Sequence, residues 1–307
     1  MHRTGRLVEV QTADGLRLNG FWQTACDEKD TDLSSRPFAW IVVHGVAGNF
    51  YNSSLLGMLS ESLLQIGHDV LRINTRGRDP IAYVATGGGN TRVGAAYEMI
   101  ADSRIDLAAW IDWMRSLGYQ RIGLLGHSLG AIKVALIVSE DPACRVDALI
   151  CLSPPRLVPE ILRGDPKYAH RYAEDLEAAR LLVADGKPES LLSIRFPQPM
   201  LISAATFLDK YGRVDPYDYM KMAGNIHLPS LWCFGAEEVD GQRASFRRCD
   251  VALQSVIEGT PNHTLRVIPN ADHAYTRARS NLMSAICEWI AEKIQPLQLK
   301  SKSSSGC

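Results

Sequence analysis

Short hydrophobic runs recur along the chain and alternate with segments in which hydrophobic residues repeat every three or four positions. The runs span residues 40–43, 70–73, 122–125, 148–152, 231–234 and 265–268. Runs of this length without polar alternation are typical of strands covered on both faces, as in a parallel sheet. Helical spacing occurs over residues 55–64, 105–113, 132–138 and 282–294. The pattern predicts the α/β class, with a mostly parallel central sheet flanked by helices.

The start of the chain follows a different pattern. Hydrophobic and polar residues alternate over 7–10 and 16–18, on either side of Asp14-Gly15. Alternation around an Asp-Gly pair predicts a β-hairpin.

The interval from Pro154 to Leu228 breaks the rhythm of strands and helices. It has no convincing strand pattern, its spacing is mostly helical, and a structureless loop of that length is improbable. We expect a helical cap inserted over the sheet. The predicted organisation is a core formed by residues 1–153 and 229–299, a cap at 154–228, and a Ser- and Lys-rich flexible tail at 300–307.

Composition and charge narrow the class of protein. Of the 307 residues, 46% are hydrophobic and 22% charged, which is typical of a globular protein. The formal net charge of −1 gives no long-range attraction to nucleic acid or anionic lipid. No apolar run follows the first six residues and none reaches eighteen, so we expect neither a signal peptide nor a membrane span.

The cysteines and glycines suggest no cofactor. Seven cysteines are scattered without a C-x-x-C pair, so we expect reduced, mostly buried thiols in a cytoplasmic protein rather than disulfides or a zinc site. No metal-ligand spacing appears, and Gly87–Gly89 lacks the surroundings of a phosphate-binding loop. That glycine run is expected to form a flexible loop.

Gly126-His127-Ser128-Leu129-Gly130 is the segment with the clearest chemistry. It follows the predicted strand 122–125 and leads into a predicted helix. A sharp turn from strand to helix crowds the central residue, and glycine, which lacks a Cβ, relieves the crowding on both sides. The serine hydroxyl is then presented at the carboxyl edge of the sheet. The alternative is a serine that merely caps the helix.

In this context the motif resembles the nucleophile turn of the α/β-hydrolase family, and the resemblance extends from the hairpin to Ile294. It implies the α/β-hydrolase fold with a helical cap, and Ser128 as nucleophile. A serine needs a base. The family's histidine follows the last strand, which implies His273 here, whereas His263 lies at the opposite end of that strand and is expected at the surface.

The resemblance also implies a carboxylate that orients the histidine. The family usually has Asp three residues after the glycine that ends the preceding strand, and here that position is Glu238, after Gly235. Glu237 and Asp240 stay open as alternatives. The order serine, acid, histidine is the family's order.

Acyl transfer requires donors for the negative charge that develops on the substrate oxygen. The resemblance implies two backbone N–H groups for this oxyanion hole. One belongs to Leu129, directly after the nucleophile. The other belongs to Val46, in the loop that begins His44-Gly45.

These residues and the resemblance together predict a metal-independent serine hydrolase that cleaves a small-molecule ester, thioester or amide. Among these activities, a carboxylesterase is favoured over a thioesterase or an amide hydrolase. Tyrosine, phenylalanine and methionine residues in the predicted cap favour an apolar or aromatic substrate. The family's dehalogenases and epoxide hydrolases use Asp at the nucleophile position, so Ser128 disfavours them. A slow or non-hydrolytic ligand-binding protein and an acyltransferase remain alternatives.

Overall fold

The structure is a computed structural model that describes residues 5–25, 38–141, 144–212 and 217–294. At its centre is an eight-stranded sheet with the strand order β1-β2-β4-β3-β7-β8-β11-β12. These strands are β1 (Gly5–Gln11), β2 (Arg17–Gln23), β3 (Ala39–Val43), β4 (Asp69–Ile73), β7 (Ile122–His127), β8 (Ala148–Leu152), β11 (Ser230–Gly235) and β12 (His263–Ile268).

The pairing of the strands follows the two hydrophobic patterns. β1 and β2 form the predicted antiparallel hairpin, and β2 pairs antiparallel with β4. All later neighbours are parallel. β3, β8 and β11 are buried along their whole length. Their continuous hydrophobic runs therefore reflect a sheet covered on both faces, as predicted.

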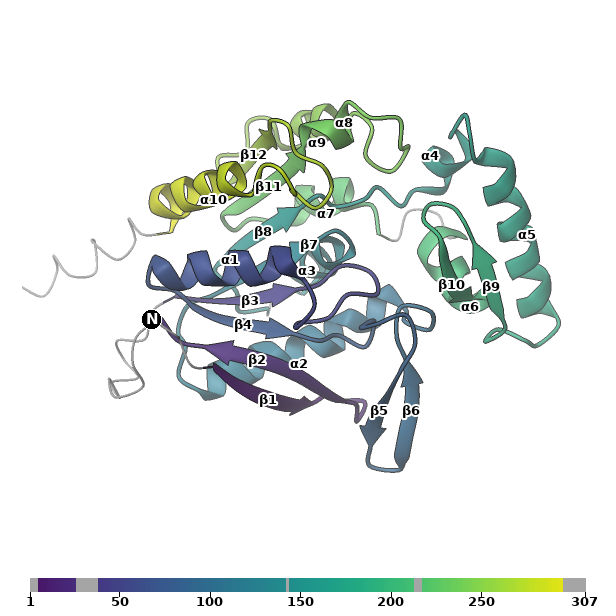
Figure 1. The fold of residues 1–307 in the computed structure, drawn as a ribbon, viewed down its shortest axis with the longest axis horizontal. Coiled ribbons are helices and arrows are strands. Elements are labelled where there is room, and N and C mark those ends of the chain that lie inside the picture. The colour runs from purple at the N-terminus through teal and green to yellow at the C-terminus, as the bar shows by residue number, and fades with distance from the viewer. Residues whose placement is uncertain (1–4, 26–37, 142–143, 213–216, 295–307) are drawn as a thin grey trace, which may run out of the picture.

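Helices cover both faces of the sheet (Figure 1). Along β3, Trp40 and Val42 pack into one hydrophobic cluster while Ile41 and Val43 pack into the other. The first cluster is completed by α1 (Ser54–Gln65) and α10 (Arg279–Lys293). The second is completed by α2 (Ser103–Ser116), α3 (Leu129–Glu140), α7 (Tyr219–Asn225) and α9 (Cys249–Ile257). Short helical turns η2 (Ile100–Asp102) and α8 (Ala236–Val239) lie within connections.

A second hairpin was not predicted. β5 (Ala82–Thr86) and β6 (Gly89–Val93) pair antiparallel, and the glycine run forms their turn instead of a flexible loop. Gly89 has a φ of 130°, which favours glycine. Most of β6 is exposed, so it lacks the hydrophobic alternation by which a strand is predicted.

The interval 154–228 contains strands as well as helices, which corrects the expectation that it has none. α4 (Pro159–Arg163) and α5 (Ala169–Ala184) precede an antiparallel hairpin of β9 (Leu191–Ile194) and β10 (Met200–Ser203). α6 (Ala204–Phe207) and the π-helical turn η3 (Leu208–Gly212) follow. Each strand has only four residues, which is too short for a periodic pattern to show. α7 lies in the same interval but packs against α3 and α9.

The described cysteines are Cys144, Cys151, Cys233, Cys249 and Cys287, and all five are free thiols. Burial raises the pKa of the Cys233 thiol to about 12. Cys26, Cys307 and the predicted tail 300–307 lie outside the described residues, and the cytoplasmic location stays a prediction. None of the helices described has the length and apolar character needed to cross a membrane. Among the described residues, no cluster of three or more His, Cys, Asp or Glu side chains is arranged to hold a metal ion.

Candidate active site

Ser128 lies at a sharp turn between β7 and α3. Its backbone has a φ of 56° and a ψ of −124°, a conformation that L-residues rarely adopt. A Cβ on Gly126 would lie 2.2 Å from the carbonyl oxygen of Gly130, and a Cβ on Gly130 would lie 2.5 Å from that of His44. Both glycines are therefore required by close backbone approach. The Ser128 side chain does not cap α3, so its hydroxyl is available for another partner.

His273 brings an imidazole to this hydroxyl from a segment 145 residues further along the chain. Its Nε2 lies 3.0 Å from the Ser128 Oγ, and its Nδ1 lies 2.5 Å from the Glu238 Oε1. A Cβ on Gly235 would lie 2.4 Å from the Ala271 carbonyl oxygen, so the loops after β11 and β12 are in direct contact. The structure thus brings together the three side chains that the sequence predicts.

The two alternative acids point elsewhere. Glu237 and Asp240 are exposed, whereas Glu238 is buried. Glu237 and Glu238 are neighbours in the single turn of α8, where successive side chains point about 100° apart. Of the three candidates, only the Glu238 carboxylate contacts His273.

Two further side chains hold Glu238, and sequence reasoning missed both. The second oxygen, Oε2, accepts hydrogen bonds from the Ser153 hydroxyl at 2.5 Å and the Gly235 N–H at 2.9 Å. The Tyr275 hydroxyl lies 2.8 Å from the Ser153 Oγ and 3.2 Å from the Cys233 carbonyl oxygen, and because the Ser153 proton is given to Glu238, the single Tyr275 proton is shared between these two acceptors. Both oxygens of the carboxylate therefore have partners, and its position is fixed.

Ser153 was predictable in part. It follows β8 directly, as Ala236 follows β11, and these parallel strands are neighbours, so their carboxyl ends meet at the same edge. Its φ of 48° is unusual for a non-glycine residue and points to a local constraint. That angle is visible only in the structure.

Two other histidines were considered in the sequence: His127 lies beside His273, and His263 lies at the opposite end of β12. The His127 Nε2–H donates to the carbonyl oxygen of His273 at 2.8 Å, and the two rings lie 4.9 Å apart. Burial, and then the nearby His273, lower the pKa of His127 to about 4. His263 is half-buried and its Nδ1 accepts a hydrogen bond from Trp232 at 3.2 Å, so the expectation of a surface residue was wrong.

The predicted oxyanion loop passes close to the nucleophile. A Cβ on Gly45 would lie 3.1 Å from the Ser128 Cβ. Val46 and Leu129 both line the pocket that contains Ser128. The Leu129 N–H belongs to the first turn of α3, where N–H groups have no acceptor within the helix. Val46 and Leu129 thus line the same pocket as the serine, and their role as oxyanion donors stays a prediction.

A buried network of polar and charged side chains holds this loop in place. His44 Nδ1 donates to the Gly45 carbonyl oxygen at 2.7 Å, and His44 Nε2 accepts from the Thr75 N–H at 3.2 Å. Lys133 Nζ then contacts the Thr75 Oγ1 at 3.0 Å and Glu98 at 2.6 Å. Burial, and then the Lys133 charge, lower the pKa of His44 to about 4. His44 is therefore neutral at pH 7.

Lys210, from η3, completes the cluster. Its ammonium lies 3.0 Å from the Glu98 Oε1, while Lys133 pairs with the Oε2. All three side chains are fully buried. The cluster links the interval 154–228 with α3 and the oxyanion loop. Sequence reasoning missed it because the members are far apart and none belongs to a motif.

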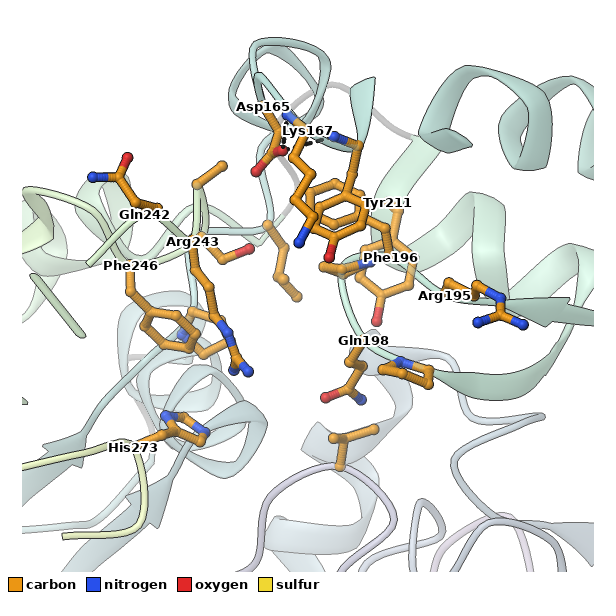
Figure 2. A pocket seen from close by; sticks show the side chains of 18 of the residues that line it. Asp165, Lys167, Arg195, Phe196, Gln198, Tyr211, Gln242, Arg243, Phe246 and His273 are labelled. Carbon is orange, nitrogen blue, oxygen red and sulfur yellow. Dashed lines mark hydrogen bonds between the residues drawn. The ribbon is translucent and has the colours of Figure 1, made fainter. Parts of the chain in front are cut away.

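Ser128 and His273 open into a cavity of about 560 Å³ (Figure 2). One side is formed by the segments that include Tyr168 and Phe196, whose rings stack at 5.3 Å. The other side is formed by the segment 242–246, where the Phe246 ring lies 4.9 Å from the ring of His273. The reactive groups therefore lie at the base of a pocket large enough for a small molecule.

Comparisons with known proteins agree with this architecture. A family model described as the alpha/beta hydrolase fold matches residues 41–189. An uncharacterized protein of Mycobacterium tuberculosis is 32% identical over 151 residues, which cover 49% of this chain and 46% of that protein. The match therefore spans less than half of the curated relative's length.

Two solved structures share the architecture over almost the whole chain. Est1E from Butyrivibrio proteoclasticus, solved with ferulic acid bound, is 19% identical, with 93% of this chain and 98% of that chain covered and a TM-score of 0.66. The esterase Pf2001 of Pyrococcus furiosus is 17% identical, with coverages of 95% and 92% and a TM-score of 0.60. The chain thus has the alpha/beta hydrolase fold, and the predicted fold class is confirmed.

Proposed function

We propose that the protein is a serine hydrolase that cleaves carboxylic esters through an acyl-enzyme on Ser128. The observation that carries the proposal is the continuous hydrogen-bonded arrangement from the Ser128 Oγ through both nitrogens of His273 to Glu238. A hydroxyl becomes a nucleophile at neutral pH when a positioned base takes its proton. The esterase neighbours with the same fold support this class.

In the first half of the reaction, His273 Nε2 takes the proton from Ser128 as its Oγ attacks the acyl carbon. The carbonyl bond opens to an oxyanion, which the N–H groups of Val46 and Leu129 stabilise. Glu238 accepts the Nδ1–H of His273 and stabilises the imidazolium. The oxyanion then re-forms the carbonyl, and the alcohol leaves with the proton from His273.

In the second half, a water molecule replaces the alcohol. His273 removes one proton from the water, whose oxygen attacks the acyl carbon of the ester on Ser128. Collapse of the second oxyanion breaks the bond to the Ser128 Oγ, which recovers its proton from His273. The products are one alcohol and one carboxylic acid, and the enzyme returns to its starting state.

We further propose that the interval 154–228 acts as a cap over the carboxyl edge of the sheet. Its residues Leu157, Tyr168, Phe196 and Tyr211 line the cavity together with Ser128 and His273 from the core. In Figure 1, α4, α5, α6, β9 and β10 gather beyond the end of the sheet. Their aromatic side chains support an apolar or aromatic portion in the substrate.

The decisive experiment combines turnover with covalent labelling. Wild type is expected to hydrolyse a short-chain nitrophenyl ester and to be labelled by a fluorophosphonate at Ser128, and Ser128→Ala is expected to lose labelling and at least about 10³-fold in kcat. Full turnover by Ser128→Ala would contradict the proposal. Ligand-induced stabilisation without turnover or labelling would instead support a binding protein, and acyl transfer to added alcohols an acyltransferase.

A further inference from the structure

The cavity above Ser128 is positively charged. Lys167, Arg195 and Arg243 line it, and Asp165 is the one carboxylate among its lining residues. The Asp165 Oδ1 accepts the N–H groups of Lys167 and Tyr168, each at 2.9 Å, so this carboxylate is engaged by its own turn. An uncharged ester would form no ion pair with these cationic side chains.

Two of the cations face the cavity from opposite sides (Figure 2). Lys167, between α4 and α5, points downward from the side of the proposed cap. Arg243, between α8 and α9, points inward from the core, whereas Arg195 points away. Within the described part of the chain, neither Lys167 nor Arg243 forms an ion pair. The Lys167 ammonium lies 5.0 Å from the centre of the Tyr168 ring, a contact that leaves its N–H donors available to a ligand, as are those of Arg243.

Arg243 is also held close to the reacting atoms. Its carbonyl oxygen accepts the N–H groups of Phe246 and Arg247 at 3.0 and 2.9 Å, which closes a tight turn. Phe246 is buried, and its ring contacts that of His273. This packing anchors the turn beside His273, and Arg243 lines the same cavity as Ser128.

We propose that the pocket selects esters that carry an anionic group, a carboxylate or a phosphate, separated from the ester bond by an apolar portion. Arg243 and Lys167 bind the anion from its two sides, while the aromatic wall contacts the apolar portion. A guanidinium matches both anions because its parallel N–H groups donate to two oxygens at once. This inference rests on the proposed ester hydrolysis and names its substrate class.

The test compares ethyl esters that share a six-carbon acyl chain and differ in the charge at its far end. Ethyl hexanoate is neutral, monoethyl adipate carries a carboxylate, and ethyl 6-phosphooxyhexanoate carries a phosphate. We expect kcat/KM to be about tenfold higher for at least one anionic ester than for the neutral one, and the preference to shrink as salt is added. The larger of the two preferences identifies the anion.

Arg243→Gln is expected to lower the ratio of anionic to neutral kcat/KM about tenfold, mainly through KM, because the anion is bound equally in the ground and transition states. Lys167→Gln lowers the same ratio. Arg247→Gln is the matched control, since Arg247 is an exposed arginine in the same segment that does not line the cavity. It is expected to leave the ratio unchanged.

The outcomes separate the two proposals. If neutral esters are hydrolysed without any anionic preference, or if Arg247→Gln changes the ratio as much as Arg243→Gln, the selectivity is wrong while ester hydrolysis stands. If no ester is hydrolysed and Ser128 is not labelled, the proposed function fails. Calorimetry with monoethyl adipate then still tests the anion site, because equal affinity for Ser128→Ala with and without Arg243→Gln overturns it.

Discussion

The charged groups at the base of the pocket differ in burial and in pairing from those at its sides. At the base, both oxygens of the buried Glu238 have hydrogen-bond partners, and Ser153 is held in turn by Tyr275. At the sides, Lys167 and Arg243 are exposed and form no ion pair with the described residues. The Glu238 carboxylate, which we propose orients His273, is buried and bonded through both oxygens. The Lys167 and Arg243 cations, which we propose bind a ligand, remain exposed to water.

The most severe test of this comparison replaces the buried carboxylate. Glu238→Gln is expected to lower kcat about 10³- to 10⁴-fold, because an amide that replaces the carboxylate no longer stabilises the imidazolium or holds the correct tautomer. Steady-state kinetics on a neutral nitrophenyl ester measures the loss. Glu237→Gln changes an exposed neighbour in the same turn and serves as the control. A Glu238→Gln enzyme with more than a tenth of normal activity would break the comparison.

The second test asks whether the free energy of unfolding depends on full pairing of the buried charges in another part of the fold, the cluster of Glu98, Lys133 and Lys210. Glu98→Gln leaves Lys133 and Lys210 buried without a carboxylate and is expected to lower the free energy of unfolding by about 3–5 kcal/mol. Lys133→Met leaves the Glu98–Lys210 pair intact and is expected to cost less. Urea denaturation compares the two. Equal losses would mean that charge pairing does not set the stability of this cluster.

The same cluster predicts a pH dependence. Burial alone raises the pKa of Glu98, but the Lys133 and Lys210 ammonium groups outweigh it and lower the pKa to about 2. The folded pKa is below the unfolded value of 4.5, so the stabilisation is present above pH 4.5 and is lost as the pH falls toward 2. Denaturation of Glu98→Gln across this range is expected to show a smaller change with pH than wild type.

The mildest test removes one anchor of the carboxylate. Ser153→Ala is expected to lower kcat about tenfold with little change in KM, because Glu238 Oε2 loses a hydrogen bond to a charged group but keeps the Gly235 N–H. Tyr275→Phe removes the hydroxyl that contacts Ser153 and the Cys233 carbonyl oxygen but no direct partner of Glu238, and it is expected to act more weakly. A normal kcat and pH profile in Ser153→Ala would mean that Ser153 has no positioning role.

Much of the fold and part of the site follow from local sequence. The hydrophobic runs predict the six parallel strands. The inner strands are buried on both faces and therefore show no polar alternation, whereas β12 at the edge of the sheet is partly exposed. The glycines on both sides of Ser128 report a turn that any other residue would obstruct. The turn at Ser128 is therefore recognisable from the residues beside it, whereas His273 was predicted from the resemblance to the α/β-hydrolase family.

Other features depend on tertiary packing. Glu237 and Glu238 are adjacent and chemically identical, and only the orientation of α8 turns the Glu238 side chain toward His273. Ser153 and Tyr275 meet Glu238 because parallel strands and their loops converge at one edge. The β9–β10 hairpin is too short to leave a pattern.

The charge of the pocket has the same origin. Lys167 and Arg243 are separated by more than seventy residues, and each looks like an ordinary surface cation in its own segment. Their shared orientation arises only when the interval 154–228 folds over the core. Local sequence thus determined the architecture and the turn that presents Ser128, since these depend on short-range sterics and periodic burial. Tertiary structure decided which carboxylate contacts His273, what holds that carboxylate and which charges line the pocket, because those require contacts between distant residues.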